Sequence, residues 1–494
     1  MRTNTNKGFW VIIFLISQSY FFAQTSENDF VTTWKTDNPG LLSDTVIRIP
    51  TFIGTYNYDV DWDNDGVFDE FGKTGNSQHD YGTPGTYTVR IRGQFPHFYI
   101  NNDPNMREKL LSVDQWGNIQ WSSMSSSFRG AVNTVINASD TPDLSNVINM
   151  SSMFNGASSI NQNLNNWDVG NIEVMRFLFN NTSFNQPLDN WDVSNVRDMQ
   201  AMFQNNSSFN QPIAMWNVGN VETFSDMFKY AINFNQPLGD WNTTNATDMR
   251  NMFSNATSFN QNIDTWDVGN VEDMYQMFFL AISYDQPLNS WNVANVQNME
   301  RMFNNADLFN QPLDNWDVGN VITMHRMFTQ TSFDQDISNW NVSNVTNMAF
   351  MFQGLTLSTE NYDAILNSWS SQTLQPNVEF HGGYSNYCSS DIARNSIINI
   401  YGWTITDGGL DCSGLSIDEF ENNNLKFHPN PTKDYLYIDY DNISTIEIFS
   451  LKGKSIKVIK PKTSKIDLTM LPTGIYILKF LFNNQFITKK LIKE

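Results

Sequence analysis

The chain carries little charge, and basic residues are especially scarce. Charged residues make up 16% of the 494, and 29 basic against 51 acidic residues give a formal net charge of −22. Nucleic acids and anionic membrane surfaces are bound through basic footprints, so this balance argues against both as partners. Neutral amides supply much of the polar surface, because asparagine, with 66 residues, is the most abundant type.

Cysteine and histidine are also rare. The two cysteines, Cys388 and Cys412, have no neighbouring histidine or second cysteine at the spacing of a metal site. In an oxidising compartment such a pair most simply forms a disulfide. The five histidines are scattered, and no nucleophile motif or glycine-rich phosphate loop is present. The sequence therefore predicts a protein that is not an enzyme and has no catalytic cofactor.

A long apolar run occurs only near the N-terminus. Arg2 and Lys7 precede an apolar stretch from Phe9 to Ala23, which is the order found in a secretory signal peptide. The stretch is shorter than the roughly 20 residues of a membrane-spanning helix, although an uncleaved anchor helix is the alternative. We therefore predict a signal peptide over 1–23 and no transmembrane segment in the mature chain.

A repeat of 24 to 25 residues fills the middle of the chain. The unit that begins at Leu188 reads LDNWDVSNVRDMQAMFQNNSSFNQP. A period this regular predicts an array in which each unit packs against its neighbours. The recurring tryptophans are Trp167, Trp191, Trp216, Trp241, Trp266, Trp291, Trp316 and Trp340.

Each unit combines two apolar periods. Trp191 and Val193 flank a polar residue, as in a short strand with one buried face. The apolar residues from Met199 to Phe203 are three and four positions apart, as on one face of a short helix. The sequence therefore predicts units of strand, turn, short helix and turn, which build an α+β solenoid over 144–354.

The units resemble a divergent leucine-rich repeat, L-x-x-L-x-L-x-x-N-x-L, with Trp and Val at the second and third apolar places and the asparagine one place early. The motif NWDVSNV, followed by M-x-x-M-F and FNQP, is similar to the repeat motif of BspA-like surface proteins. The repeat asparagine either bonds turn backbone groups of neighbouring coils or contacts a ligand. Its copies are Asn171, Asn195, Asn220, Asn245, Asn270, Asn295, Asn320 and Asn344.

The polar residue between Trp and Val forms a second ladder. On a strand this position faces solvent, and neighbouring strands lie about 4.8 Å apart. Exposed faces of solenoids are common binding surfaces, so we predict that this ladder contacts a partner; the alternative is that it only keeps the sheet soluble. The predicted partner-binding residues are Asp168, Asp192, Asn217, Asn242, Asp267, Asn292, Asp317 and Asn341.

The segment 28–105 differs from the repeats. An acidic loop precedes the run HDYGTPGTYTVRI from His79, which alternates as a strand does after its Pro-Gly turn. Together they resemble a PKD-type β-sandwich. The loop also matches the first half of a calcium-binding loop, but the bidentate glutamate is missing, so a solvated turn is the alternative. The candidate calcium ligands are Asp61, Asp63, Asp65 and Asp69.

Segments on both sides of the repeats are expected to cap them, because the ends of a solenoid need atypical units. Residues 106–143 are predicted to form degenerate leading coils. Residues 355–412 contain both cysteines and two stretches with amphipathic helical spacing, 362–369 and 390–403. We predict a C-terminal cap with a disulfide, followed by a linker over 413–426.

The last segment, 427–494, is basic, with 11 lysines against 6 acidic residues. Its P-N-P motif, Gly-Lys turn, L-P-T-G-I-Y run and lysine-rich end closely resemble the type A C-terminal sorting domain of the type IX secretion system. This resemblance implies a small β-sandwich, passage through the outer membrane, and release or surface attachment. The matching residues are Pro429, Asn430, Pro431, Gly453, Lys454, Gly474, Tyr476, Lys489 and Lys490.

These expectations combine into one hypothesis about function. We expect a secreted, surface-displayed repeat protein of a Gram-negative bacterium that binds an extracellular protein or glycan, as an adhesin or interaction protein. Its second partner is the type IX secretion machinery, through the C-terminal domain. The alternative is a non-catalytic carbohydrate-binding protein of a secreted polysaccharide-utilisation system.

Overall fold

The chain divides into two compact units, Met1–Asp411 and Cys412–Glu494, which are described separately. The predicted signal peptide, 1–23, and nearly all of the predicted linker, 413–426, lie outside the described residues. This computed structural model describes residues 26–413, 426–439, 443–450, 454–460, 464–482 and 485–494.

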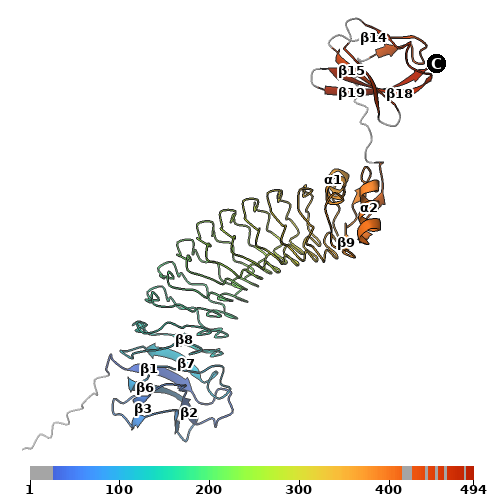
Figure 1. The fold of residues 1–494 in the computed structure, drawn as a ribbon. Coiled ribbons are helices and arrows are strands. Elements are labelled where there is room, and N and C mark those ends of the chain that lie inside the picture. The colour runs from blue at the N-terminus through green and yellow to red at the C-terminus, as the bar shows by residue number, and fades with distance from the viewer. Residues whose placement is uncertain (1–25, 414–425, 440–442, 451–453, 461–463, 483–484) are drawn as a thin grey trace, which may run out of the picture. The chain divides into compact units, whose positions relative to one another are not determined.

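The first unit begins with a β-domain, whose strands are β1 (Phe30–Lys35), β2 (Val46–Ile49), β3 (Asn57–Asp61), β4 (Glu70–Lys73), β5 (Ser77–Asp80), β6 (Thr86–Gln94), β7 (Leu110–Gln115) and β8 (Val135–Ile136). The larger sheet has the order β4-β3-β6-β1-β7-β8, and β2 pairs with β5. Figure 1 labels β1, β2, β3, β6, β7 and β8. β6 follows the predicted Pro-Gly turn and pairs antiparallel with both β1 and β3.

The larger sheet joins the β-domain to the first coils of the repeat. β7 lies in the segment predicted to form leading coils, yet it pairs antiparallel with β1, and β8 pairs parallel with β7. Backbone bonds between coils begin at Met124, whose N–H donates to the carbonyl of Asn149 at 3.1 Å. One hydrophobic core runs from Phe30 to Trp403. The β-domain, the coils and the cap are therefore packed continuously.

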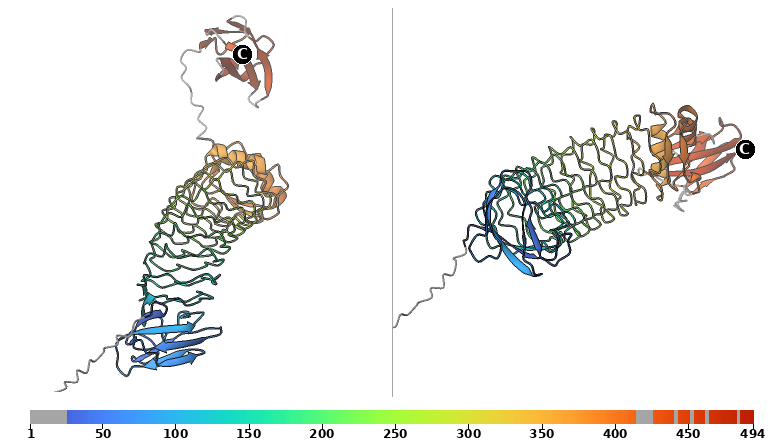
Figure 2. Two further views of the ribbon diagram at one scale, coloured as in Figure 1. Left: turned by 90° about the vertical axis from the view of Figure 1, so that its left-hand side faces the viewer. Right: turned by 90° about the horizontal axis from the view of Figure 1, so that it is seen from below.

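The middle of the first unit is a stack of coils over 122–355, which we call the coil stack (Figures 1 and 2). The N–H groups of Met199, Ala201 and Phe203 donate to carbonyls of the following coil at 2.8 to 3.2 Å. Each coil also contributes one residue to a parallel β-ladder that crosses the stack. This bridge row consists of Asn149, Val174, Asp198, Thr223, Asp248, Asp273, Asn298, Thr323 and Asn347.

Consecutive turns take the place of the helix predicted in each coil. Ala201 and Asn205 have positive φ angles of 53° and 55°. The N–H of Met202 donates to the carbonyl of Met199 at 3.1 Å, which closes a turn. In an α-helix the N–H groups bond along the helix axis, whereas alternate N–H groups here bond the neighbouring coil. Apolar spacing of three and four fits both structures, so the helix prediction was wrong and the fold is mostly β.

The strand is also displaced from its predicted place. The segment around Trp191 contains no strand, and the bridge falls seven residues later, at Asp198. Trp191 is nevertheless buried, and its indole N–H donates to the carbonyl of Leu164 in the preceding coil at 2.9 Å. The alternation of apolar and polar residues therefore indicated burial correctly but not the backbone conformation.

Aromatic side chains form rows inside the coil stack. The ring centroids of Phe203 and Phe228 are 5.8 Å apart, and those of Trp291 and Trp316 are 6.5 Å apart. Paired strands lie only about 4.8 Å apart. Neighbouring coils are therefore farther apart at the aromatic rows than paired strands are at the bridge row. This difference curves the stack and places the bridge row on its inner side, which agrees with the arc in Figure 1.

The coil stack ends in a cap that contains α1 (Thr359–Trp369), β9 (Glu379–His381), β10 (Asn386–Tyr387), α2 (Asp391–Tyr401), β11 (Thr404–Thr406) and β12 (Gly409–Leu410). Both helices lie at the predicted amphipathic stretches, and they are the only helices among the described residues. Met348 pairs with Phe380 of β9, which extends the bridge row into the cap. Cys388 and Cys412 are disulfide-bonded, as predicted.

The second unit is a small β-domain with its own core. Its strands form two sheets, with the orders β13-β14-β17 and β16-β15-β18-β19. The strands are β13 (Lys426–His428), β14 (Tyr435–Asp439), β15 (Ile443–Ser450), β16 (Ser455–Ile459), β17 (Lys465–Asp467), β18 (Gly474–Phe482) and β19 (Gln485–Lys493).

Candidate functional site

The predicted partner-binding ladder lies at turns on the surface of the coil stack. All eight side chains are exposed, and each accepts a hydrogen bond from the backbone N–H two residues later, which closes an Asx turn. For Asp192 the bond is 3.0 Å long, and hydrogen bonds from Ser194 hold the pKa of this carboxyl below its usual value. The same bond is made by Asp168, Asn217, Asn242, Asp267, Asn292, Asp317 and Asn341.

Ladder residues of neighbouring coils lie side by side. A β-carbon on Gly269 would lie 3.1 Å from Asp267 Oδ1 and 3.3 Å from Asn292 Nδ2, so both polar groups approach the same glycine. The Asx turn gives each ladder residue a structural role. Contact with a partner stays a prediction for all eight.

The repeat asparagine bonds the neighbouring coil, which confirms the structural one of its two interpretations. Its Nδ2 donates to a carbonyl 25 or 26 residues earlier; Asn245 and Asn295 do so at 2.6 Å. These bonds tie each turn to the preceding coil. The other members of this asparagine row are Asn171, Asn195, Asn220, Asn270, Asn320 and Asn344.

A further amide ladder was not predicted from the sequence. Asn210 Oδ1 accepts the backbone N–H of Asn235 at 2.9 Å and the side-chain N–H of Gln236 at 3.0 Å, both from the next coil. Asn235 accepts the same two bonds from Asn260 and Gln261. The recurring FNQ motif could have indicated this ladder, because an Asn-Gln pair that recurs from coil to coil can form hydrogen bonds with the same pair in the next coil.

One exposed position varies from coil to coil. It immediately precedes the bridge row, so it lies beside this row on the inner side of the stack. Acidic, basic, amide, hydroxyl and apolar side chains all occur there, and Arg197 approaches Glu222 of the next coil to 3.5 Å. This variable column consists of Ile148, Glu173, Arg197, Glu222, Thr247, Glu272, Gln297, Ile322 and Thr346.

A groove of about 600 Å³ lies between the variable column and the asparagine row. Its lining offers amides, one hydroxyl and one carboxylate, which donate and accept hydrogen bonds but do not form a paired acid and base. The arrangement therefore suits recognition of a polar surface. The lining residues are Glu272, Asn295, Gln297, Asn320, Ile322, Asn344, Thr346 and Gln375.

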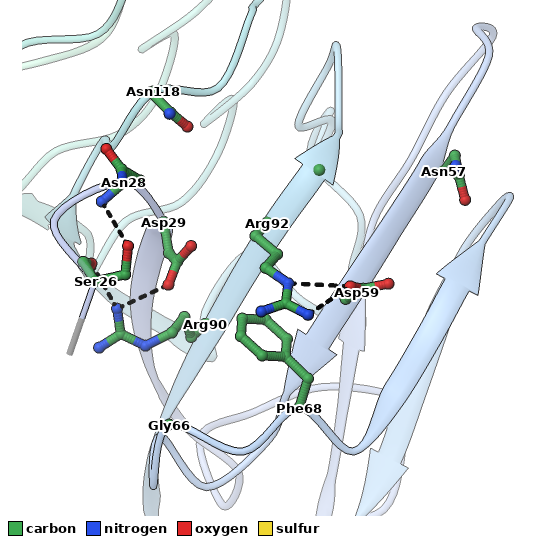
Figure 3. A pocket seen from close by; sticks show the side chains of 11 residues that line it. Ser26, Asn28, Asp29, Asn57, Asp59, Gly66, Phe68, Arg90, Arg92 and Asn118 are labelled. Atoms are coloured by element: carbon green, nitrogen blue, oxygen red, sulfur yellow. Dashed lines mark hydrogen bonds and ion pairs between the residues drawn. The ribbon is translucent and has the colours of Figure 1, made fainter. Parts of the chain in front are cut away.

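A second pocket of about 600 Å³ lies on the β-domain (Figure 3). Two arginines of β6 line it: Arg90 lies 3.3 Å from a carboxylate oxygen of Asp29, and Arg92 lies 3.0 Å from one of Asp59. The Arg92 guanidinium is also 3.7 Å from the ring centroid of Phe68. Burial raises the pKa of Asp29 despite its contact with Arg90. The charged groups labelled in Figure 3 are thus already paired with one another.

The candidate calcium ligands are brought together only in part. Asp61, Asp63 and Asp65 each offer an oxygen, and these oxygens lie within 4.8 Å of one another. Asp69 is not part of this group; it accepts the backbone N–H of Trp62 at 2.9 Å. Burial raises the pKa of Asp61, although backbone N–H groups of the loop bond its carboxylate. The loop could hold a cation with three carboxylates rather than four.

The predicted sorting residues lie in the second unit, except that Gly453 is outside the described residues. Asn430 donates to the carbonyl of Lys490 and accepts the N–H of Ile492, both at 2.8 Å, which ties the P-N-P motif to β19. The hydroxyl of Tyr476 donates to a carbonyl four residues earlier at 2.8 Å. The remaining predicted residues are Pro429, Pro431, Lys454, Gly474 and Lys489.

Two protein families match parts of this chain. The sequence matches the family described as "Mycoplasma protein of unknown function, DUF285" over residues 122–239, 180–288, 231–332 and 281–382, which together span more than half of the chain. Residues 426–494 match the family described as "Secretion system C-terminal sorting domain". No curated protein matches the chain.

The sorting domain indicates a protein that the type IX machinery delivers to the cell surface or beyond it. Within the described ranges, every helix is too short or too polar to cross a membrane. The repeats that resemble those of BspA-like surface proteins are DUF285 repeats, and the chain therefore belongs to this family of repeat proteins.

Proposed function

We propose that this protein acts outside the cell by binding an extracellular protein or glycan through the inner face of its coil stack. The inner face comprises the variable column, the asparagine row and the groove between them. We propose an adhesive or interaction role without catalysis, which agrees with the delivery route that the sorting domain indicates.

One observation supports this proposal. The polar groups that recur in every coil form hydrogen bonds between coils, whereas the side chains of the variable column are exposed. In one coil, Asn270 and Trp266 donate to carbonyls of the preceding coil at 2.8 and 2.9 Å. The backbone of the variable column also joins neighbouring coils, since the N–H of Glu222 donates to the carbonyl of Arg197 at 2.8 Å. Its exposed side chains, however, differ in charge and size from coil to coil. A scaffold does not need this variation, but a specific binding surface does, because specificity depends on differences in side-chain chemistry.

Charge narrows the class of partner. Between residues 144 and 352 the sequence has 20 acidic and 6 basic residues. The ladder and the groove present carboxylates and amides to solvent. A partner with basic or hydroxyl-rich groups is therefore favoured on electrostatic grounds.

Probing arrays of extracellular matrix proteins and of glycans with the mature protein tests the proposal. One variant set changes the variable column: Glu173→Gln, Glu222→Gln and Glu272→Gln. A second set changes the ladder: Asp168→Asn, Asp192→Asn, Asp267→Asn and Asp317→Asn. Asparagine already occupies the ladder in half of the coils, so the second set keeps the Asx turns and removes only charge.

We expect the first set to weaken binding about tenfold, because hydrogen bonds to charged groups are lost, with no change in thermal stability. The second set shows whether the ladder also contacts the partner. Binding that the first set leaves unchanged would contradict the assignment of the binding surface to the variable column.

The second candidate is a non-catalytic carbohydrate-binding function, which the amide-lined groove supports. Binding to glycans alone on the arrays would favour it, and binding to matrix proteins alone would exclude it. Incubation of the same glycans with the mature protein tests the absence of catalysis: release of shorter products would show that the protein is an enzyme.

We also propose two finer fold assignments. A parallel bridge row on the inner side of a curved stack supports a divergent leucine-rich-repeat solenoid. Antiparallel pairing in a two-sheet domain supports a PKD-like assignment for the β-domain. A crystal structure of the mature chain, compared with structures of both families, would test them.

We propose calcium as a ligand of the acidic loop in the β-domain. The proximity of Asp61, Asp63 and Asp65 supports this, since calcium prefers carboxylate oxygens. Calorimetric titration of the mature protein should show binding that Asp63→Asn weakens. Asp69→Asn is the matched control, because Asp69 lies outside the group. The absence of binding heat would identify the loop as a structural turn.

A further inference from the structure

Most arginines of this acidic chain are engaged by carboxylates. Of the eleven arginines that the structure describes, eight form ion pairs. Arg326, which is not among the eight, lies 4.7 Å from the ring centroid of Phe350. The other two are Arg129 and Arg176, and both are exposed. With a net charge of −22, the chain has carboxylates in excess, yet neither of these two guanidinium groups forms an ion pair with a described residue.

Arg129 and Arg176 line the same depression, of about 400 Å³, where the β-domain meets the first coils. Its lining contains no carboxylate. Four serines and two asparagines also line it, and two of these serines, Ser126 and Ser151, are buried. The Oγ atoms of Ser125 and Ser151 lie 3.0 Å apart in a hydrogen bond. The depression therefore combines positive charge with many small hydrogen-bonding groups.

The two guanidinium groups keep most of their donors available. Arg129 Nη1 donates to Asn101 Oδ1 at 3.3 Å, and among the described residues the side chain of Arg176 makes no hydrogen bond or ion pair. A guanidinium presents five N–H donors in a planar fork that matches the oxygens of a carboxylate or a similar anion. Both guanidinium groups therefore have donors left with which to bind an anionic group in the depression.

An aromatic ring completes the lining beside Arg176. Phe177 is half-buried and has a φ angle of 58°, a left-handed conformation that is rare for a bulky side chain. The equivalent residue of the next coil is Ala201, with the same conformation, so the coil does not require an aromatic ring here. Apolar rings with a few placed polar groups are typical of small-ligand sites.

We propose that this depression binds an acidic saccharide, whose carboxylate or sulfate group pairs with Arg129 and Arg176. Its ring hydroxyls hydrogen-bond the serine and asparagine groups, and one C–H face packs on Phe177. An acidic peptide would also pair with the arginines, but it offers fewer hydroxyl groups to the serines and asparagines than a saccharide ring does. The depression and the amide-lined groove involve different coils, so this inference does not rest on the proposed function.

Calorimetric titration of the mature full chain with defined oligosaccharides tests the proposal. The probes are oligogalacturonate, a sulfated chondroitin oligosaccharide and a neutral malto-oligosaccharide, with polyglutamate as the acidic peptide. We expect one or both acidic oligosaccharides to bind and the neutral one not to bind. Arg129→Gln and Arg176→Gln should each weaken this binding about tenfold, because charge-assisted hydrogen bonds are lost.

Arg326→Gln is the matched control, since it removes an arginine that forms no ion pair and lies outside the depression. This variant, and the variable-column variants above, should bind the acidic oligosaccharides as the wild type does. Arg176→Lys keeps the charge and should retain part of the affinity, which separates lost recognition from lost folding. No binding of either acidic oligosaccharide, or binding unchanged in both Gln variants, would overturn the proposal. Tighter binding of polyglutamate would assign the depression to an acidic peptide instead.

Discussion

Tyr284 is the tyrosine in a row of phenylalanines, and it shows how one buried hydroxyl affects the stability of the coil stack. Its ring stacks on Phe259 and Phe309 with centroids 5.8 and 6.3 Å apart. The hydroxyl is buried and has no hydrogen-bond partner among the described residues. Burial raises the pKa of Tyr284 well above its usual value, so the phenol stays neutral. The ring therefore contributes to packing, whereas the hydroxyl has lost its hydration without compensation.

The change Tyr284→Phe should increase the free energy of unfolding by about 1 kcal/mol, because it removes an unsatisfied buried hydroxyl and keeps the ring. Equilibrium denaturation in urea measures this difference. Phe259→Tyr is the reciprocal control and should lower stability by a similar amount. A loss of stability in Tyr284→Phe would show that the hydroxyl is satisfied in solution.

At the scale of the element, each coil depends on turns that most residues avoid. Ala201 and Asn205 adopt positive φ angles in one coil, and Asp226 and Tyr230 do so in the next. A left-handed conformation costs a non-glycine residue roughly 1–2 kcal/mol. Hydrogen bonds to neighbouring coils on both sides hold these residues in place. Stacking, rather than local preference, therefore determines the conformation of the coil.

Asn205 allows this strain to be measured, because its side chain is exposed. We expect Asn205→Val to lower the free energy of unfolding by about 1–2 kcal/mol, since β-branched residues tolerate positive φ poorly. Asn205→Gly should be neutral or slightly stabilising. Ser207→Val is a control at an exposed position that lacks a positive φ angle. Equal losses in Asn205→Val and Ser207→Val would show that the left-handed turn carries no particular strain.

The cap depends on one buried carboxylate. Asp363 of α1 accepts the backbone N–H groups of Ser389 and Ser390 at 2.8 and 3.1 Å, just before α2 begins. The Ser390 hydroxyl also donates to it at 2.6 Å. Burial alone would raise the pKa of Asp363, but these hydrogen bonds hold it below its usual value of 3.8. The ionised form of this side chain therefore stabilises the contact between the two helices.

The stabilisation should depend on pH. Because the pKa of Asp363 is lower in the folded than in the unfolded chain, its contribution is complete above about pH 4 and is lost as the pH falls through the folded value. Asp363→Asn should lower the free energy of unfolding by about 2 kcal/mol at pH 7, since the amide nitrogen cannot accept these bonds. The difference from wild type should shrink at pH 3. Glu360→Gln, at an exposed site on the same helix, is the control and should leave the free energy of unfolding at pH 7 nearly unchanged.

At the scale of the whole molecule, the chain has two separate hydrophobic cores. One extends from Phe30 to Trp403 through the β-domain, the coil stack and the cap, and the other lies within the second unit. Units that share a core unfold together, whereas units with separate cores can unfold separately. The first unit should therefore behave as one long cooperative structure despite its different parts.

Calorimetry should accordingly resolve two unfolding transitions. Phe253→Ala, in the first core, should lower the temperature of the larger transition, since truncating a buried phenylalanine costs about 3–5 kcal/mol. Phe480→Ala, in the second core, should lower only the smaller transition. Each variant is the control for the other. A shift of both transitions by either substitution would contradict the independence of the two cores.

The net charge of the whole molecule does not describe the charge of each part of its surface. An average of −22 argues against anionic partners for the molecule as a whole. The depression around Arg129 and Arg176 is a local exception, because carboxylates are absent from its lining. Composition describes the mean surface, and only the tertiary structure shows which arginines are left unpaired.

The sequence predicted a residue's role in the candidate site where that residue recurs in every coil and always bonds the same backbone group. The asparagine row bonds the preceding coil as predicted, because any stack places the same carbonyl one repeat away. The polar residue next to Trp191 was predicted on a strand, but it lies in an Asx turn, since alternating burial does not define φ and ψ. The variable column was missed because the sequence does not show on which side the stack curves.

The sequence by itself determined the repeat, the burial of its apolar residues, the disulfide and the sorting domain. These follow from local patterns: period, hydrophobicity and motif residues at set spacing. Only the tertiary structure decided that the coils contain turns instead of helices, and that the bridge row lies on the inner side. The physical reason is that N–H groups here bond the neighbouring coil, and such bonds depend on residues about 25 positions away rather than on the local sequence.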